Sequence, residues 1–139
     1  MRRYSILALL SMLCAAAVVQ PAAAAEWSTS YGRMELPDDP EPGSLRAEYS
    51  SDEGRIIGTL RQPKCLGCGL EFDGIWVEAG SARECAREQD GSLHWGAVTF
   101  EFDPGITSFG GKWDYCGEGE TYDWRGQLGT RMLVLDGGR

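Results

Sequence analysis

The residues of this chain best suited to ligand recognition are its tryptophans, which number five in 139 residues. Indole rings stack on flat or sugar-like ligands, so four of them are candidate binding residues if the strands that carry them close into a cup: Trp76, Trp95, Trp113 and Trp124. The alternative is that the rings fill the core, as the interior of a small barrel requires. The apolar residues and glycines expected at the inward positions favour this filled interior.

Catalytic patterns are weak in the sequence. The single histidine, His94, follows the turn signal Asp90-Gly91 and is expected near the start of a strand, with its ring partly exposed. The chain contains neither a Gly-x-Ser-x-Gly motif nor a cysteine-nucleophile motif that could act with this histidine. We therefore expect a protein that is not an enzyme.

Acidic side chains offer a second possible chemistry. Asp114, Glu118, Glu120 and Asp123 lie within ten residues, and a pair of carboxylates can hydrolyse glycosides. The same cluster, or the acids of residues 38–41, has the oxygen ligands that calcium takes, but neither follows a known calcium loop. Because the chain holds 21 acids, such clusters arise by chance. We expect no metal and no cofactor.

The N-terminus predicts export. Arg2 and Arg3, an apolar run from Ile6 to Val19 and the sequence Ala23-x-Ala25 have the order of a signal peptide, residues 1–25. The apolar run is roughly 14 residues, whereas a membrane-spanning helix needs about 20. We expect a mature domain, residues 26–139, without a membrane span, located in the periplasm or secreted.

Charge limits the partners of that domain. Loss of Arg2 and Arg3 lowers the basic residues from 13 to 11 against 21 acids, which leaves a net charge of about −10. Such a charge repels phosphate backbones and anionic lipid surfaces. We expect no nucleic-acid partner, and a monomer whose partner is an unidentified protein or small ligand.

The mature domain keeps four cysteines, Cys65, Cys68, Cys85 and Cys116, which in an oxidising compartment predict two disulfides. A four-thiolate zinc site is the alternative, because Cys65-x-x-Cys68 has ligand spacing. The other two cysteines are separated by 30 residues instead of forming a second close pair, which favours disulfides.

Short segments bounded by glycine, proline or aspartate predict an all-β domain. The expected strands are Trp27–Leu36, Leu45–Ser50, Arg55–Arg61, Leu70–Glu78, Leu93–Phe102, Thr107–Tyr115, Thr121–Gly126 and Arg131–Leu135. The first changes its apolar parity at Gly32, which predicts a glycine bulge. The proline-rich segment from Leu36 to Gly43 is expected to be a surface loop. Seven or eight such strands predict an antiparallel meander that forms a closed or nearly closed small barrel.

The order of the strands predicts the cysteine pairs. Cys65 and Cys68 fall in one connection, whereas Cys85 and Cys116 follow two later strands that end on the opposite side of a meander. A disulfide tolerates only about 4–7 Å between its Cα atoms, so it cannot span the length of a strand. The expected bonds are Cys65–Cys68 and Cys85–Cys116.

A repeat marks two of the expected strands. Phe72-x-Gly74-x-Trp76 recurs as Phe109-x-Gly111-x-Trp113, and Ile56-x-Gly58-x-Leu60 and Trp124-x-Gly126 are related pieces. Residues two apart share a face of a strand, so each glycine should lie between two bulky inward groups and admit a neighbouring ring. Strong curvature of the sheet is expected there.

These placements carry a resemblance. With Trp27-x-Thr29-x-x-Gly32, the segment from Gly54 to Leu60, the two Phe-x-Gly-x-Trp motifs and Trp124-Arg125-Gly126, residues 26–128 resemble secreted bacterial β-meander domains of unassigned activity. The opening segment and the later stretch Gly54-x-x-x-Gly58-Thr59 are also distantly similar to avidin-type barrels, which implies an eight-stranded meander with a small ligand inside. The polar ligand contacts of avidins have no counterparts by position, so biotin binding is not implied.

The sequence favours an exported, non-enzymatic domain that acts through its surface, as an envelope binding protein or an inhibitor. The alternative is a small-ligand-binding β-barrel of the avidin or lipocalin type. The first interpretation predicts a solid core, and the second predicts a cavity lined by tryptophans.

Overall fold

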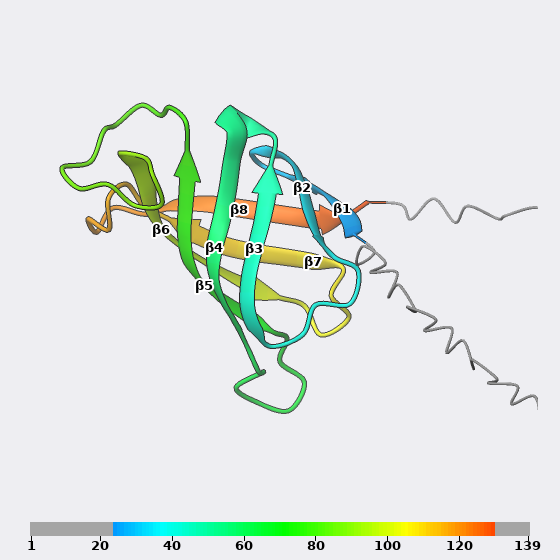
Figure 1. Cartoon of the computed structure of the whole chain (residues 1–139). Helices are drawn as coiled ribbons and strands as arrows, with labels where there is room; N and C mark the ends of the chain where they lie inside the picture. Colours follow the sequence, from blue (N-terminus) through cyan, green and yellow to red (C-terminus); the bar gives the residue numbers. More distant parts are fainter. Residues whose placement is uncertain (1–23, 130–139) are drawn as a thin grey trace, which may run out of the picture.

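The computed structural model of the protein describes residues 24–129, which form one antiparallel sheet closed into a barrel (Figure 1). Eight strands follow one another around it: β1 (Ala24–Thr29), β2 (Gly32–Pro37), β3 (Gly43–Tyr49), β4 (Gly54–Arg61), β5 (Glu71–Glu78), β6 (His94–Phe102), β7 (Ser108–Trp113) and β8 (Tyr122–Leu128). β8 closes the sheet against β1 over the pairs Trp27–Leu128 to Thr29–Gly126. The predicted all-β meander and closed barrel are confirmed.

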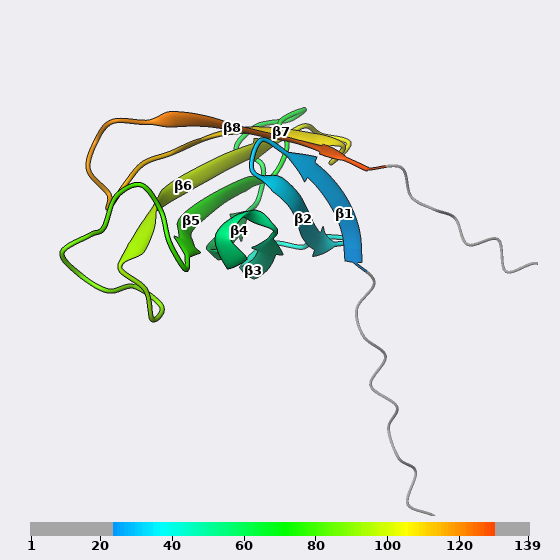
Figure 2. The ribbon, with the colours of Figure 1, turned by 90° about the horizontal axis from the view of Figure 1, so that it is seen from above.

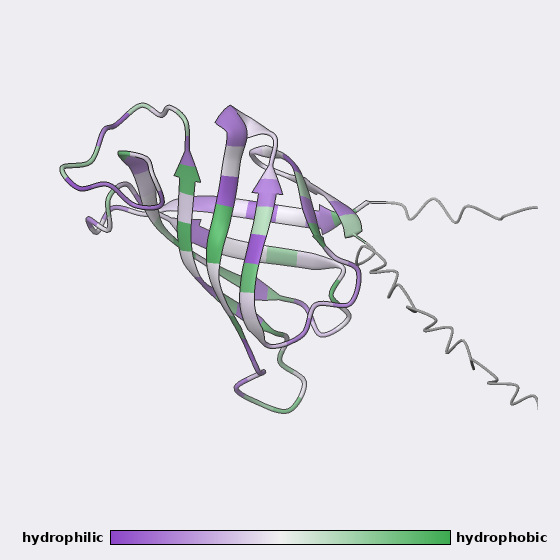
Figure 3. Cartoon of the chain, in the orientation of Figure 1, coloured by the Kyte–Doolittle hydropathy of each residue, from purple (hydrophilic) through white to green (hydrophobic). Residues whose placement is uncertain are grey.

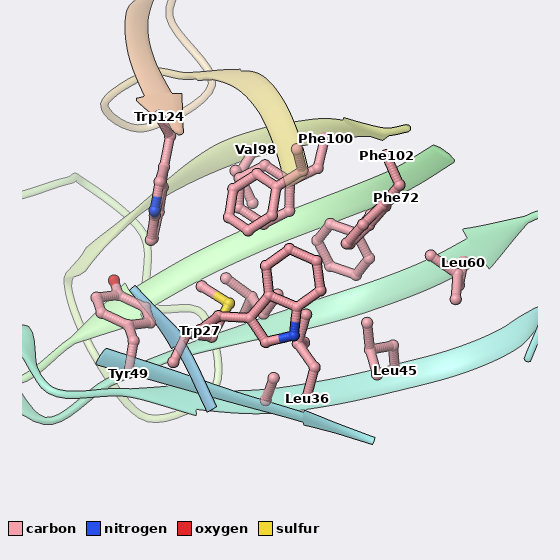
Figure 4. Packing of buried hydrophobic residues seen from close by; sticks show 14 of the residues in the cluster. Trp27, Leu36, Leu45, Tyr49, Leu60, Phe72, Val98, Phe100, Phe102 and Trp124 are labelled. Carbon is pink, nitrogen blue, oxygen red and sulfur yellow. The ribbon is translucent and has the colours of Figure 1, made fainter. Parts of the chain in front are cut away.

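Alternating side chains explain why these segments form strands with one buried face. In β3, Leu45, Ala47 and Tyr49 are buried and the residues between them are exposed. The same alternation is visible along β3 as bands of hydrophobic and hydrophilic colour (Figure 3). The inward residues meet in a core in which Trp27, Phe72 and Phe100 are each 1 % exposed (Figure 4). This part of the interior is filled, as the sequence suggested.

The first expected strand is in fact a hairpin, so the prediction of a bulge at Gly32 was wrong. β1 and β2 are joined by Ser30 and Tyr31, with Thr29 paired to Gly32. The apolar parity changes there because the chain reverses direction. Gly32 has a φ of +91°, and a Cβ atom at this position would lie 2.2 Å from the Ser50 hydroxyl oxygen, so glycine is required.

The other strand predictions agree closely with the structure, with two exceptions. Leu36 and Pro37 belong to β2 and Gly43 begins β3, so the proline-rich loop is shorter than expected. The expected strand Arg131–Leu135 lies outside the described residues. The barrel thus reaches eight strands through the β1–β2 hairpin.

The strand glycines let neighbouring atoms pack close to the backbone, although these atoms do not always belong to an aromatic ring. A Cβ atom at Gly111 would lie 2.1 Å from the Thr99 carbonyl oxygen and 2.5 Å from the Phe100 ring, so here a ring is admitted, as the repeat predicted. At Gly74 the nearest atoms instead belong to the β4 backbone, with the Ile57 carbonyl oxygen at 2.2 Å and the Gly58 Cα atom at 2.8 Å. For Gly74 the expectation of an admitted ring was therefore wrong, because two glycines face each other across paired strands.

The seam between β2 and β3 is short. These strands pair only at Met34–Tyr49 and Glu35–Glu48, whereas β3 pairs with β4 from Gly43–Leu60 to Tyr49–Gly54. Seen from above, the β1–β2 hairpin lies beside β3 and β4 (Figure 2). Beyond the two pairs, β2 and β3 diverge towards the proline-rich loop.

Four connections meet at one end of the barrel, which we call the mouth: residues 30–31, 50–53, 79–93 and 114–121. Cys85 and Cys116 join the last two with Cα atoms 5.5 Å apart. Cys65 and Cys68 form the second disulfide in the β4–β5 connection at the opposite end, which we call the far end. Both predicted pairs are confirmed, and two disulfides are typical of an oxidising, extracellular compartment. Residues 24–129 include no helix long and apolar enough to cross a membrane.

Candidate functional site

A cavity of about 190 Å³ opens at the mouth of the barrel. Five aromatic side chains line it, together with smaller and polar residues from the end of β5 and from the β3–β4 and β5–β6 connections: Tyr31, Trp76, Trp113, Tyr115, Trp124, Ser51, Asp52, Glu78, Ser81 and Ala82. Three of the four tryptophans singled out from the sequence therefore meet at one site. Their binding role remains a prediction.

The rings are set steeply against one another. The Trp113 ring lies 5.5 Å from Trp76, 5.6 Å from Tyr31 and 5.0 Å from Tyr115, measured between ring centroids. The corresponding angles between ring planes are 88°, 87° and 79°. Edge-to-face contacts of this kind favour one arrangement of the rings, so this wall of the cavity is formed in advance.

Hydrogen bonds fix two of the indoles. Trp76 Nε1 donates to the Asp114 carbonyl oxygen at 2.8 Å, and Trp113 Nε1 donates to the Tyr31 hydroxyl at 2.9 Å. Asp114 is itself held in place, because its Oδ1 accepts hydrogen bonds from the backbone N–H groups of Ala97 and Gly117. The β7–β8 connection thus holds Trp76 in position.

Trp124 differs from these two tryptophans. Its side chain is 2 % exposed, and its Nε1 is the buried side-chain nitrogen or oxygen that has no hydrogen-bond partner within residues 24–129. The rings of Tyr31 and Tyr49 lie 4.9 Å away, and the indole nitrogen is on the side away from Phe100 (Figure 4). A buried donor without a partner costs about 1–3 kcal/mol. Trp124 is also one of the residues that line the cavity.

The charged wall of the cavity is acidic. Tyr49 donates a hydrogen bond of 2.8 Å to Glu78 Oε1. Burial, then the nearby Glu78 charge, raises the pKa of Tyr49 above its ordinary value. Burial also raises the pKa of Glu78, and the charge of Asp52 adds to this effect, whereas the Tyr49 hydrogen bond lowers it. The lining contains these two carboxylates and no lysine or arginine.

His94 lies next to the site without lining it. Its ring is partly buried, as expected, and Nδ1 lies 3.0 Å from the Ser81 hydroxyl oxygen. That hydroxyl donates to the Arg83 carbonyl at 2.7 Å, so its proton is directed away from the histidine. This arrangement differs from that of a nucleophile activated by a base.

The fourth candidate, Trp95, lies apart from the cavity. Gly96, Val98 and Phe100 are the inward residues of β6, so Trp95 falls on the outer face of the strand. Its Nε1 donates to the Arg87 carbonyl at 2.7 Å and thereby secures the β5–β6 connection. The structure thus separates this residue from the other three.

The acidic cluster does not converge on a common point. Asp114 accepts backbone hydrogen bonds, Glu118 pairs with Arg83 at 2.6 Å, and Asp123 pairs with Lys112. Among the residues that the structure describes, no group of three or more histidines, cysteines and acids is placed to hold a metal ion.

A larger depression, of about 720 Å³, lies over β6, β7 and β8, where Gly110 and Gly111 leave the sheet without side chains. Lys112 and Asp123, which border it, neutralise each other. No buried polar side-chain atom of its lining lacks a partner in the described part of the chain. The mouth cavity is therefore the stronger candidate.

Sequence reasoning did not single out Tyr31, Asp52 or Ser81, because they lie in connections distant from one another in the chain. Glu78 carried a usable signal, since it shares the inward parity of Phe72 and Trp76 along β5. Searches of known proteins returned no matching family model, no matching curated protein and no matching solved structure.

Proposed function

We propose that the protein is a small-ligand-binding barrel and that the mouth cavity is its binding site. The observation that carries this proposal is the buried Trp124 Nε1, a donor without a protein partner on a residue that lines the cavity. A ligand that accepts its hydrogen bond would remove the cost of leaving it unpaired.

The size and rigidity of the cavity support the same function. Its volume of about 190 Å³ is below the roughly 300–1,000 Å³ of pockets for drug-sized ligands, so the ligand is small. The Cys85–Cys116 disulfide joins two connections that contribute to its wall, which limits the ordering required on binding. Of the two sequence-based interpretations, we therefore prefer the small-ligand barrel over surface action as an envelope binding protein or inhibitor.

The two disulfides and the signal-like N-terminus support action outside the cytoplasm. We infer a monomeric, non-enzymatic protein located in the periplasm or secreted. The acidic composition is consistent with a ligand other than nucleic acid.

The five indole N–H groups provide the test. In a heteronuclear NMR spectrum of the disulfide-bonded protein, each gives one signal, which a Trp→Phe substitution assigns. Compounds from a chemically broad set of small molecules should shift the Trp124 and Trp113 signals and leave Trp95 unchanged. Trp124→Phe should lower the affinity for these compounds, and Trp95→Phe is the matched control. If no compound shifts the Trp124 signal, or if Trp95 responds equally, the proposal fails.

A further inference from the structure

The charges around the mouth cavity indicate the sign of its ligand. Asp52 and Glu78 are the charged residues of the lining. Two arginines that adjoin or lie in the connections at the mouth are paired with other acids, since Arg55 contacts Asp90 at 2.6 Å and Arg83 contacts Glu118 at 2.6 Å. With an acidic excess over the whole chain as well, the potential at the mouth attracts cations.

The aromatic lining favours a particular kind of cation. Four rings from different parts of the fold, Tyr31, Trp76, Trp113 and Tyr115, stand at steep angles around one small volume. Aromatic faces attract cations, and groups of such rings recognise substituted ammonium ions. The N–H groups of Trp76 and Trp113 are already bonded to protein oxygens, so neither ring requires a ligand acceptor.

Trp124 adds a second requirement. Its free Nε1–H donates, so an ammonium group cannot satisfy it and the ligand must also carry an acceptor. A carboxylate on the ligand would be repelled by Glu78 and Asp52 in the same cavity. A hydroxyl, ether or carbonyl oxygen satisfies the donor without this repulsion.

Resting on the proposed function, we propose that the ligand is a small organic cation, a substituted ammonium that also carries a neutral oxygen acceptor. The ammonium group lies among the rings beside Glu78 and Asp52. The oxygen atom accepts the hydrogen bond from Trp124 Nε1.

Choline and its uncharged carbon analogue 3,3-dimethylbutan-1-ol have the same shape and hydroxyl group and differ in charge. Each is titrated into the disulfide-bonded protein while the indole N–H signals are followed. Choline should bind about tenfold more tightly than the analogue, a difference of about 1.4 kcal/mol, because cation–π contacts favour the charged ligand. Tetramethylammonium, which lacks the oxygen, should shift Trp113 and leave Trp124 nearly unchanged.

Two substitutions test the charges. Glu78→Gln retains an acceptor for Tyr49, and Asp52→Asn suits a residue whose φ is +45°. Each substitution should lower the affinity for choline several-fold and leave the affinity for the uncharged analogue unchanged. Glu48→Gln, on the exposed face of β3, is the matched control and should change neither affinity.

The outcomes separate the two proposals. Equal affinity for choline and its analogue, or no effect of Glu78→Gln and Asp52→Asn, would overturn the inference of a cation and leave a small-ligand site intact. Binding of uncharged compounds alone in the broad screen would do the same. An ammonium group could also belong to a protein lysine, so Nα-acetyl-lysine methylamide is titrated in parallel. If it binds more tightly than choline, the free small cation is the wrong source.

Discussion

The Tyr49 hydroxyl donates a hydrogen bond of 2.8 Å to Oε1 of the Glu78 carboxylate. One residue ends β3 and the other ends β5, so the bond spans the intervening strand β4 at the mouth. It holds a partly buried carboxylate in the wall of the cavity.

Substitution Tyr49→Phe should therefore destabilise the protein by about 1–3 kcal/mol, because it leaves the partly buried Glu78 without this donor. It should also raise the pKa of Glu78 further, since the hydrogen bond lowers that pKa in the native protein. Denaturant unfolding and an NMR titration of the carboxyl carbon measure the two effects. Tyr122→Phe, at an exposed tyrosine, is the control, and an equal loss in both variants would contradict the prediction.

Trp124→Phe should destabilise the protein less than Trp76→Phe. Both substitutions shorten a buried ring, but only Trp76 loses a hydrogen bond, the one to the Asp114 carbonyl oxygen. The difference in unfolding free energy should be about 1 kcal/mol or more, the usual value of such a bond. Urea unfolding of the two variants without ligand decides this, and a larger loss for Trp124→Phe would show that its nitrogen has a partner in solution.

The disulfide at the mouth should matter more for stability and for binding than the one at the far end. Replacing Cys85 and Cys116 with serine releases a long loop, for which the chain-entropy model gives roughly 3–4 kcal/mol. It should also lower the affinity of the mouth cavity for its ligands, because the two connections that line the site are no longer joined. The control replaces Cys65 and Cys68, which close a much shorter loop. Comparable losses in stability and affinity from both pairs would refute this order.

Binding of a cation at the mouth should weaken on acidification. Burial raises the pKa of Glu78 above its ordinary value, so the carboxylate gains its proton at a higher pH than an exposed glutamate does. Asp52 and His94 face Glu78 electrostatically, and Tyr49 bonds to it, so all three influence the midpoint. The affinity for choline should decrease as the pH falls through the raised pKa of Glu78. Glu78→Gln should remove this pH dependence.

The same shift predicts the pH dependence of stability. The folded state binds the Glu78 proton more tightly than the unfolded chain, so this residue destabilises the fold above its raised pKa. That cost decreases as the pH falls through the raised pKa and is gone below the ordinary pKa of the unfolded chain. Glu78→Gln should therefore unfold at an equal or slightly higher denaturant concentration than the native protein at neutral pH. A clear loss of stability would show that the Tyr49 hydrogen bond to the ionised carboxylate outweighs the cost of burying its charge.

Local patterns were sufficient for most of the barrel because alternation, glycine placement and turn residues are read over a few positions. The β1–β2 hairpin was missed because Ser30-Tyr31 is not a typical turn sequence, and only the parity change at Gly32 marked it. The cysteine pairs followed from strand order, which is also a local property once each strand is recognised.

The candidate site was predictable only in part. Trp76 and Trp113 occupy equivalent places in the repeat, and both line the cavity. The outward position of Trp95 could have been inferred from the inward set that includes Val98 and Phe100. The addition of Tyr31 and Asp52 depends on how connections fold over the mouth, which no periodic pattern encodes.

Because β2 and β3 share only two residue pairs, we expect the barrel to open more readily between these strands than between the others. Its two residue pairs lie near the mouth, and the strands part towards the far end. Breathing motions should therefore begin at the far end, and β3 amides that face β2 near Leu45 should exchange with solvent before those between β5 and β6. The far end can therefore fluctuate while the mouth, which the aromatic rings line, keeps its shape.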